Sequence, residues 1–281
     1  MISEGRRPNR PSPLKFSVCH ADLIWVGETG AATTFVFVGG LHRSGTSLVC
    51  RCLAEHPLIG GFAGAGEDDR RQIRDGIDPA SFLTEQSPAV SRQTADELFA
   101  KWSREWDPGR PFLVARAPEN LVRTRFLQAL FPESRFVMVM RDPIAVAGAM
   151  QRESRLSDLE LIAHWLICHE RLLADVPGVR HLNLVRYEDL VAGPEQVLSG
   201  MFGLLGLEAP PETALSVLQH SNELYLDAWQ RRRSSWRRRR AYDEIIAALE
   251  SRVTRFGYSL ANPGERVFCD RAVDALAPRA A

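Results

Sequence analysis

Short apolar runs alternate with longer amphipathic stretches along the chain from about residue 35 onward. Four of these runs predict strands: "FVFVG" at 35–39, "FLVA" at 112–115, "RFVMVM" at 135–140 and "HLNLV" at 181–185. Continuous apolar runs of this length are typical of strands that are buried on both faces of a sheet. The sequence therefore predicts at least four buried strands.

Amphipathic stretches follow each of the strand candidates. Periodic apolar positions predict helices over 46–55, 119–131, 143–152, 157–176, 193–207 and 240–258. Pro143 suits a first helical position, and Ser157 with Glu160 has the spacing of a capping box. Because strands that alternate with helices form parallel sheets with helices on their faces, we predict an α/β protein with three layers.

The alternating pattern also suggests where the domain lies. Residues 1–34 form a leader that is rich in Arg and Pro and at least partly disordered, since little of it can be buried. The stretch "ADLIWVG" at 21–27 could add a short strand to it. The domain itself then covers residues 35–260, and residues 261–281 form a C-terminal tail.

Composition and charge narrow the classes of function. The formal net charge of the 281 residues is zero, so no overall attraction to nucleic acid or to an anionic membrane is expected. No segment resembles a secretory signal, and no apolar run is long enough to span a membrane. The five cysteines are scattered, without the spacing of metal ligands. We therefore expect a cytoplasmic protein with no metal, nucleic-acid or membrane partner.

Polar residues follow each strand candidate at its carboxyl end. These segments are His42–Ser47, Arg116–Asn120, Arg141–Asp142 and Tyr187. The carboxyl ends of parallel strands share one edge of the sheet, and ligands of such sheets bind there. The sequence therefore predicts that these four segments converge on one site.

The first of these segments, "GGLHRSGTS" at 39–47, has the chemistry of an anion-binding loop. Its glycines allow tight turns, and the helix that follows offers unpaired N–H groups and a partial positive charge. Arg43 adds a fork of donors that suits phosphate or sulfate oxygens. The backbone and hydroxyl donors of the loop come from four residues: Ser44, Gly45, Thr46 and Ser47.

The loop differs from the phosphate-binding loop of nucleoside triphosphatases. That pattern, GxxxxGK followed by Ser or Thr, requires a lysine where this chain has Thr46. No plain aspartate ends a strand ready for Mg²⁺, because Asp142 stands behind Arg141. A metal-assisted kinase or nucleoside triphosphatase with a degenerate loop is therefore a disfavoured alternative.

Several segments resemble the sulfotransferase family, in the order in which that family has them. "GGLHRSGTS" resembles the 5′-phosphosulfate-binding loop, and "FPESRFVMVMRDPIAVAGAM" is similar to the 3′-phosphate segment. "LNLVRYEDLVAGPEQVL" and "SRVTRFGYSL" are similar to later segments of bacterial members and of protein-tyrosine sulfotransferases. The resemblance implies the P-loop-like sulfotransferase fold. It also implies metal-free transfer of sulfonate from 3′-phosphoadenosine 5′-phosphosulfate (PAPS) to a hydroxyl or amine.

The resemblance assigns roles to four residues outside the loop donors. Arg43 would contact the 5′-phosphate and the sulfonate, and Arg141 would contact the 3′-phosphate. Tyr187 matches a tyrosine that contacts the nucleotide, although a tyrosine at a strand end can equally pack on the core. Arg116 stands where the family has a lysine that stabilises the leaving phosphate, or is a surface arginine before a helix.

One position departs from the family and weakens the expected grip on the 3′-phosphate. The family often has a serine eight residues after the arginine that matches Arg141, and this chain has Ala149 there. A second alternative is therefore a protein that keeps the sulfotransferase-like fold only to bind a nucleotide. The arginine at position 116, where the family has a lysine, also favours this alternative.

The catalytic base has several candidates. Relatives have a glutamate shortly after the "HP" that closes the first helix, and Glu67 matches it in a Gly-rich loop, beside Asp68. A partly desolvated carboxylate at the sheet edge could accept a proton near neutral pH. His42 and His56 are rivals, since histidine is the commonest base, although His56 suits a helix end.

The arginine-rich stretch "QRRRSSWRRRR" at 230–240 allows three interpretations. It can be a nucleic-acid or heparin patch, a solvated face, or a mobile segment that closes over the 3′-phosphate. We favour the third narrowly, because the zero net charge of the chain disfavours a dedicated nucleic-acid binder. The acceptor, by contrast, has no motif, and a small molecule, a saccharide or a peptide would fit.

Overall fold

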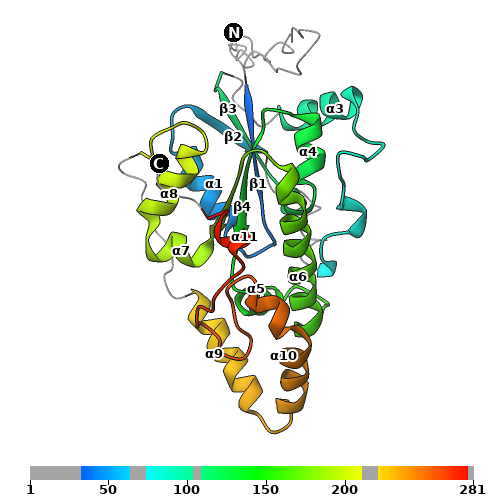
Figure 1. The fold of residues 1–281 in the computed structure, drawn as a ribbon, viewed down its shortest axis with the longest axis vertical. Coiled ribbons are helices and arrows are strands. Elements are labelled where there is room, and N and C mark those ends of the chain that lie inside the picture. The colour runs from blue at the N-terminus through cyan, green and yellow to red at the C-terminus, as the bar shows by residue number, and fades with distance from the viewer. Residues whose placement is uncertain (1–32, 64–73, 104–108, 211–220, 278–281) are drawn as a thin grey trace, which may run out of the picture.

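The computed structural model describes residues 33–63, 74–103, 109–210 and 221–277. Five parallel strands form a sheet through its middle, in the order β2-β3-β1-β4-β5 (Figure 1). The strands are β1 (Thr34–Gly39), β2 (Ile59–Ala63), β3 (Phe112–Arg116), β4 (Arg135–Met140) and β5 (Leu182–Arg186). The four predicted strands are thus confirmed to within one residue at each end.

β2 is the strand that the pattern of apolar residues did not predict. It lies at the edge of the sheet beside β3, and its pairing shifts register between Gly60 and Phe62. Two adjacent glycines interrupt its apolar run. Edge position, glycine and a bulge-like irregularity commonly occur together, and they remove the continuous apolar signal of a central strand.

Helices cover both faces of the sheet, which confirms the predicted three layers. Alternate side chains of β1 face opposite layers: Phe35 and Phe37 belong to one apolar cluster, whereas Val36 and Val38 belong to the other. The first cluster is rich in aromatic rings, with the centroids of Phe35 and Phe131 4.6 Å apart. Burial of both faces explains why β1 reads as an unbroken apolar run.

The helices divide between the two layers (Figure 1). The layer that packs on the valines of β1 contains α1 (Thr46–Ala54), α7 (Tyr187–Ala192) and α8 (Pro194–Gly203). The opposite layer contains α3 (Arg92–Trp102), α4 (Thr124–Leu130), α5 (Pro143–Met150) and α6 (Asp158–Asp175). Three short 3₁₀ helices, η1 (Pro79–Ser81), η2 (Pro118–Val122) and η3 (Val176–Gly178), lie in the connections.

The predicted start signals of α5 and α6 are confirmed. Pro143 is the first residue of α5. At the start of α6, the Ser157 hydroxyl accepts a hydrogen bond from the Glu160 N–H at 3.3 Å, and the Glu160 carboxylate accepts one from the Ser157 N–H at 2.8 Å. This reciprocal pair satisfies two N–H groups that the helix itself leaves without acceptors.

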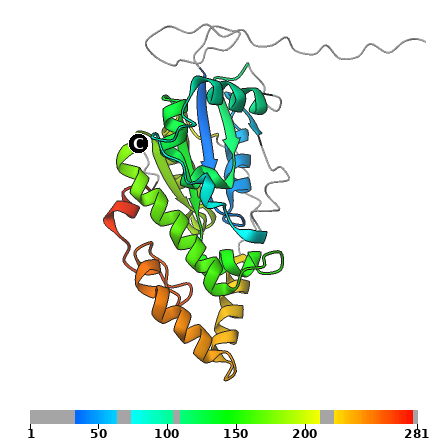
Figure 2. The ribbon, with the colours of Figure 1, turned by 90° about the vertical axis from the view of Figure 1, so that its right-hand side faces the viewer.

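A helical hairpin extends from the carboxyl end of the sheet (Figures 1 and 2). It consists of α9 (Ser221–Ser234) and α10 (Arg239–Thr254), so the arginine-rich stretch forms the end of α9, the turn and the start of α10. α9 packs so closely on α5 that a Cβ added to Gly148 would lie 2.7 Å from Cδ1 of Tyr225. Arg252 of α10 pairs with Glu170 of α6 at 2.6 Å.

The end of the described chain returns to the sheet. The short helix α11 (Arg271–Asp274) lies within the segment 261–281 that we set apart as a tail. The Leu276 carbonyl of the same segment accepts a hydrogen bond from the N–H of Leu184 in β5 at 2.7 Å. Val273 is buried at this contact. Within the described ranges, no helix has both the length and the apolar character that crossing a membrane requires.

Candidate functional site

The loop between β1 and α1 is tightly turned. Gly40 passes so close to β4 that an added Cβ would lie 2.6 Å from the Val139 carbonyl oxygen. Arg43 and Gly45 both have left-handed backbones, with φ angles of 67° and 103°. The Ser44 N–H closes the turn by donating to the Leu41 carbonyl at 3.1 Å. A non-glycine residue with such a φ is uncommon and is characteristic of binding loops.

The turn leaves a set of backbone donors at the start of α1. Among the described residues, the N–H groups of Gly45, Thr46 and Ser47 donate no hydrogen bond. The Thr46 side chain is buried, whereas that of Ser47 is exposed. Donors of this kind at the N-terminus of a nine-residue helix have the chemistry that anion binding requires, so the anion cradle stays a prediction that this geometry suits.

Arg141 follows β4 and is only 6% exposed. Its Nη1 donates to the carbonyl oxygen of Arg43 at 2.7 Å, so it supports the left-handed turn of the loop directly. Its Nε donates to Oδ1 of Asn222 in α9, also at 2.7 Å. The carbonyl oxygen of Arg141 accepts a hydrogen bond from the indole of Trp165 at 3.0 Å. Arg141 thus joins the loop, the sheet and the hairpin.

Tyr187 packs on the core, as one of its two interpretations expected, and it also lies beside the loop. It is buried at the end of β5, and its ring lies under the loop, where a Cβ added to Gly45 would be 2.7 Å from its Cδ2. The ring also faces the Arg141 guanidinium, whose Cζ is 4.5 Å from the ring centroid. Tyr187 is therefore both a packing residue and part of the floor of the candidate site.

Arg43 belongs to the loop, and Arg116 approaches the loop from β3. The side chain of Arg43 pairs with Glu153, which follows α5, and both side chains are about half exposed. Arg116 ends β3, and its Nη1 lies 3.5 Å from the Ser47 hydroxyl. Ion pairs between exposed side chains contribute little free energy to stability. Arg43 can therefore leave Glu153 and bind an anionic ligand with only a small loss of free energy.

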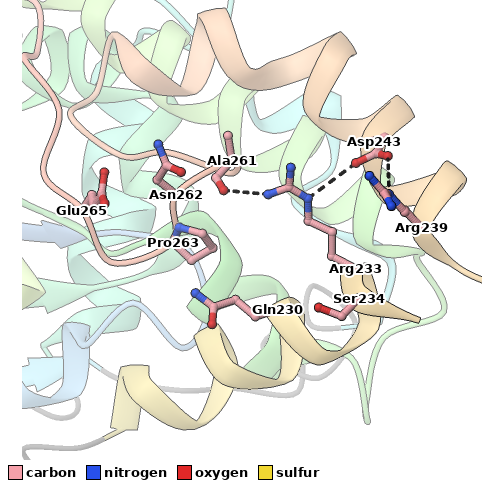
Figure 3. A pocket seen from close by; sticks show the side chains of 9 residues that line it. All are labelled: Gln230, Arg233, Ser234, Arg239, Asp243, Ala261, Asn262, Pro263 and Glu265. Atoms are coloured by element: carbon pink, nitrogen blue, oxygen red, sulfur yellow. Dashed lines mark hydrogen bonds and ion pairs between the residues drawn. The ribbon is translucent and has the colours of Figure 1, made fainter. Parts of the chain in front are cut away.

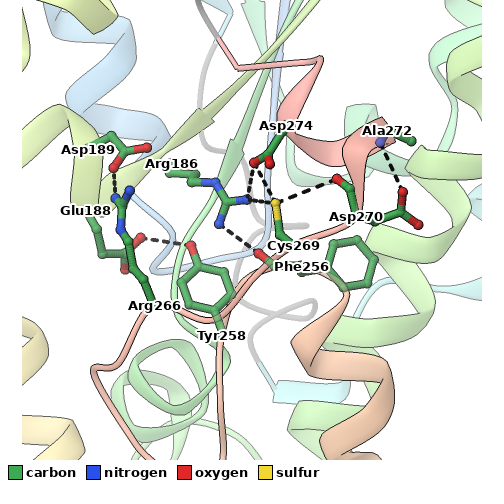
Figure 4. Close-up of polar contacts among 10 residues, drawn as sticks. All are labelled: Arg186, Glu188, Asp189, Phe256, Tyr258, Arg266, Cys269, Asp270, Ala272 and Asp274. Carbon is green, nitrogen blue, oxygen red and sulfur yellow. Dashed lines mark hydrogen bonds and ion pairs between the residues drawn. The ribbon is translucent and has the colours of Figure 1, made fainter.

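Glu188, directly after Tyr187, was not identified from the sequence, although it lies within the "RYEDLV" segment. Its Oε1 accepts hydrogen bonds from the Asp142 N–H at 3.0 Å and from Nδ2 of Asn222 at 2.7 Å. Its Oε2 accepts one from the Tyr258 hydroxyl at 2.9 Å (Figure 4). Glu188 therefore connects the three segments "RD", "RYEDLV" and "GY", which lie far apart in the sequence.

Arg186, also in "RYEDLV", holds the end of the chain beside this network (Figure 4). Its guanidinium donates to the Phe256 carbonyl oxygen at 2.7 Å and to Sγ of Cys269 at 3.1 Å. Asp274 lies 3.8 Å from the same guanidinium. The conformation of the "GY" segment is thus fixed by β5.

Asp142 is a buried carboxyl group at the start of α5. Its Oδ1 accepts hydrogen bonds from the Ile144 and Ala145 N–H groups at 2.8 and 3.2 Å. The pKa of this carboxyl is raised to about 7, first by its burial and then by the negative charge of Glu188. The two N–H groups and Arg141 oppose this shift without cancelling it.

Replacing Asp142 by asparagine is expected to change how stability depends on pH. A raised pKa means that the folded protein binds this proton more tightly than the unfolded chain does, so stability falls as the pH rises from about 4 to about 7. The slope due to one such group reaches at most about 1.4 kcal/mol per pH unit. Asparagine keeps the helix cap and has no charge to bury, so Asp142→Asn should flatten this slope and raise stability above about pH 7.

Urea denaturation between about pH 5 and about pH 8 measures this effect. Asp142→Ala serves as the control, because it removes the charge and the cap together. It should also flatten the slope, but it should cost about 0.5–2 kcal/mol at every pH. An unchanged slope in Asp142→Asn would show that Asp142 does not titrate in this range.

The structure describes only some of the candidates for the catalytic base. Glu67 and Asp68 lie outside the described residues. His56 follows α1, where its Nδ1 accepts a hydrogen bond from the Leu58 N–H at 3.1 Å and its ring faces Phe202 at 5.6 Å. These contacts fit a residue that packs at the end of a helix, which is the alternative that the sequence offered for His56. His42 lies within the loop and is half-buried.

The arginines of the hairpin pair mostly with acidic side chains of the same region. Arg232 lies 3.4 Å from Asp158, Arg240 lies 3.0 Å from Glu244, and Arg233 and Arg239 both approach Asp243. Arg233 and Arg239 line a cavity of about 620 Å³ between the hairpin and the turn at 261–265 (Figure 3). Trp236 at the turn is 83% exposed.

Side chains that commonly bind metals are dispersed in the described part of the chain. No three His, Cys, Asp or Glu side chains of these residues lie together in a way that could hold a metal ion. The four described cysteines, Cys50, Cys52, Cys168 and Cys269, are free and buried. Burial raises the pKa of the Cys50 thiol to about 12, which keeps it protonated and unreactive.

The fold and the loop together define an α/β protein with a glycine-rich turn and a helix N-terminus at the carboxyl edge of its parallel sheet. A model of the sulfotransferase family matches residues 36–211, more than half of the chain. The protein therefore belongs to the sulfotransferase family, as the resemblance of its motifs indicated.

Individual relatives are distant. Nodulation protein NoeE of Sinorhizobium fredii is 24% identical over 235 residues, which cover 70% of this chain and 55% of that protein. Protein-tyrosine sulfotransferase 2 of Gallus gallus is 26% identical over 194 residues, which cover 61% of this chain and 51% of that protein. The chain thus spans about half the length of these curated relatives.

Solved structures of sulfotransferases are similar at lower identity. The sulfotransferase from Alicyclobacillus acidocaldarius has a TM-score of 0.46 and 17% identity, and the match covers 79% of this chain and 96% of that one.

Proposed function

We propose that the protein transfers the sulfonate group of PAPS to a hydroxyl or an amine of an acceptor, by in-line displacement and without a metal ion. The observation that carries this proposal is the loop between β1 and α1. It presents three backbone N–H groups that donate no hydrogen bond among the described residues. It also carries Arg43 and contacts Arg116, which ends β3, and Arg141, which follows β4. Membership of the sulfotransferase family supports the choice of donor.

The proposed reaction exchanges one bond to sulfur for another. The acceptor oxygen or nitrogen bonds to sulfur while the bond between sulfur and the bridging oxygen of the donor breaks. The electron pair of the broken bond stays on the 5′-phosphate, which leaves as part of 3′-phosphoadenosine 5′-phosphate. The acceptor's proton passes to a base, for which Glu67 is our candidate by its resemblance to the base of relatives.

The loop suits a phosphosulfate group by the chemistry of its donors. The N–H groups of Gly45, Thr46 and Ser47 point out of the first turn of α1, where the helix dipole also favours negative charge. In the proposal these groups and Arg43, with the hydroxyls of the loop, hold the 5′-phosphate and the sulfonate. Preorganised donors of this kind stabilise charge that builds up in a transition state.

Three residues beyond the loop complete the proposed donor site. Arg116, beside Ser47, would stabilise the leaving oxygen by its charge, since arginine does not give up its proton in proteins. Arg141 would contact the 3′-phosphate, and Tyr187 would contact the nucleotide between the loop and Arg141. Arg141 is already buried and oriented, so it would not have to be ordered when the donor binds.

The acceptor class in the proposal is a small molecule, a saccharide or a peptide. The chicken relative is named for action on protein tyrosine, which makes a peptide phenol one of the acceptors to examine. We further place the reaction in the cytoplasm, where the free thiols of the described cysteines would remain reduced.

Calorimetry with nucleotides tests the proposal without any acceptor. We expect 3′-phosphoadenosine 5′-phosphate to bind at least about tenfold more tightly than AMP, because the 3′-phosphate adds a charge-assisted contact. Chelation of divalent metals should leave this binding unchanged. Tighter binding of ATP with Mg²⁺ would instead identify a nucleotide kinase or triphosphatase. Equal affinity for 3′-phosphoadenosine 5′-phosphate and AMP would contradict the assignment of Arg141.

A further inference from the structure

Asn222 of α9 is the residue through which the hairpin contacts Arg141. Its Oδ1 accepts from Nε of Arg141 at 2.7 Å, and its Nδ2 donates to Oε1 of Glu188 at 2.7 Å. The two ends of one amide thus connect the arginine after β4 with the glutamate after β5. The carbonyl end of the amide faces the arginine.

Glu188 determines which way this amide faces. The amino group of Asn222 donates to Oε1 of Glu188, and the guanidinium of Arg141, which can only donate, is left to the carbonyl of the same amide. Glu188 is itself held in place, because Oε1 also accepts from the Asp142 N–H at 3.0 Å and Oε2 accepts from the Tyr258 hydroxyl at 2.9 Å. The orientation of the amide is therefore fixed from three directions.

The fixed amide limits the orientation of the Arg141 guanidinium. Nε is directed at Asn222 and Nη1 at the Arg43 carbonyl, so two of its donors define the plane of the group. Tyr187 and Tyr225 contribute ring faces 4.5 and 5.8 Å from Cζ. An arginine that is ordered in advance loses less conformational entropy when an anion binds to it.

We propose that Asn222 and Glu188 are positioning residues that orient Arg141 toward the 3′-phosphate of the donor. This inference rests on the proposed function and extends it to residues of α9 and of the segment after β5. Neither residue touches the donor in this scheme; both act through Arg141. The preference for a 3′-phosphorylated nucleotide therefore depends on a chain of contacts from Tyr258 through Glu188 and Asn222.

The test compares affinities for 3′-phosphoadenosine 5′-phosphate and for AMP in variants, by calorimetry. Asn222→Ala and Glu188→Ala should each reduce the ratio of the two affinities by about tenfold, which corresponds to one charge-assisted hydrogen bond. Affinity for AMP, which lacks the 3′-phosphate, should change little. A residue with a merely structural role would lower both affinities together or only the melting temperature.

A conservative variant separates hydrogen bonding from charge. In Glu188→Gln the amide oxygen can accept from Asn222 and Asp142 while the amide nitrogen donates to the Tyr258 oxygen, so the preference for the 3′-phosphate should be retained. Asn183→Ala is the matched control: Asn183 lies in β5 and donates to the Gly200 carbonyl at 2.8 Å, away from Arg141. It should leave the affinity ratio unchanged.

Two outcomes would overturn the inference in distinguishable ways. If the unaltered protein prefers 3′-phosphoadenosine 5′-phosphate and both Asn222→Ala and Glu188→Ala keep that preference, then Arg141 needs no positioning and only this inference fails. If the unaltered protein has no such preference, the proposed function fails and this inference fails with it. Should Glu188→Ala not fold, Asn222→Ala, a change at a half-buried residue, tests the same inference.

Discussion

Replacing Gly45 with alanine is expected to abolish most donor binding while leaving the protein folded. Gly45 has a φ of 103°, and an added Cβ would lie 2.7 Å from Cδ2 of Tyr187. Left-handed backbone costs an L-residue roughly 1–2 kcal/mol, and the contact with a buried ring adds to this cost. We expect the loop to relieve both by moving, which would displace the N–H groups that we propose hold the anion.

A displacement of about 1 Å in such a site can lower activity about 10²-fold, and we expect a loss of that order in turnover and in affinity for 3′-phosphoadenosine 5′-phosphate. Gly206→Ala is the matched control, because Gly206 also has a positive φ, of 68°, but no atom lies within 4 Å of the added Cβ. It should lower stability slightly and leave nucleotide binding intact. If Gly45→Ala binds the nucleotide with normal affinity, the loop is not part of the donor site.

Trp165→Ala is expected to have the largest effect on stability. Trp165 is fully buried in α6, where its ring stacks on His169 at 4.0 Å and meets Phe256 edge-on at 5.2 Å. Truncation of a buried tryptophan costs about 3–5 kcal/mol through lost burial and the cavity that remains. It would also leave the Arg141 carbonyl without the indole N–H that lies 3.0 Å from it.

The same substitution at Trp236 is the control for this measurement. Trp236 is 83% exposed at the turn of the hairpin, and exposed substitutions usually change stability by less than about 0.5 kcal/mol. Urea denaturation of the two variants should therefore differ by several kcal/mol. Similar midpoints would mean that α6 does not pack against the C-terminal segment as described.

Much of the fold could be predicted because the sheet is buried on both faces. The runs that form β1 and β4 are apolar at every central position, so the sequence predicts that both faces of these strands are buried. Pro143 and Ser157 marked helix starts by local chemistry alone. β2 lacked such a signal, because its glycines and its edge position remove the need for a continuous apolar run.

The predicted convergence of the loop, Arg116, Arg141 and Tyr187 on one edge is confirmed, because parallel strands place their carboxyl ends together. The contact between Asn222 and Arg141 could not be predicted in this way. It depends on how α9 packs on α5, which no local pattern encodes. Glu188 was within a quoted motif, yet its partners come from three separate segments.

The order of the strands has a consequence for synthesis on the ribosome. β1 is the first strand of the described residues and lies in the centre of the sheet, but its neighbours are β3 and β4. Residues 40 to 111 must be made before β3 begins, which takes about 4–15 s at roughly 5–20 residues per second. During that interval the segment Phe35–Val38 has no partner strand to shield it. We therefore expect the nascent chain to require a holding chaperone at this stage.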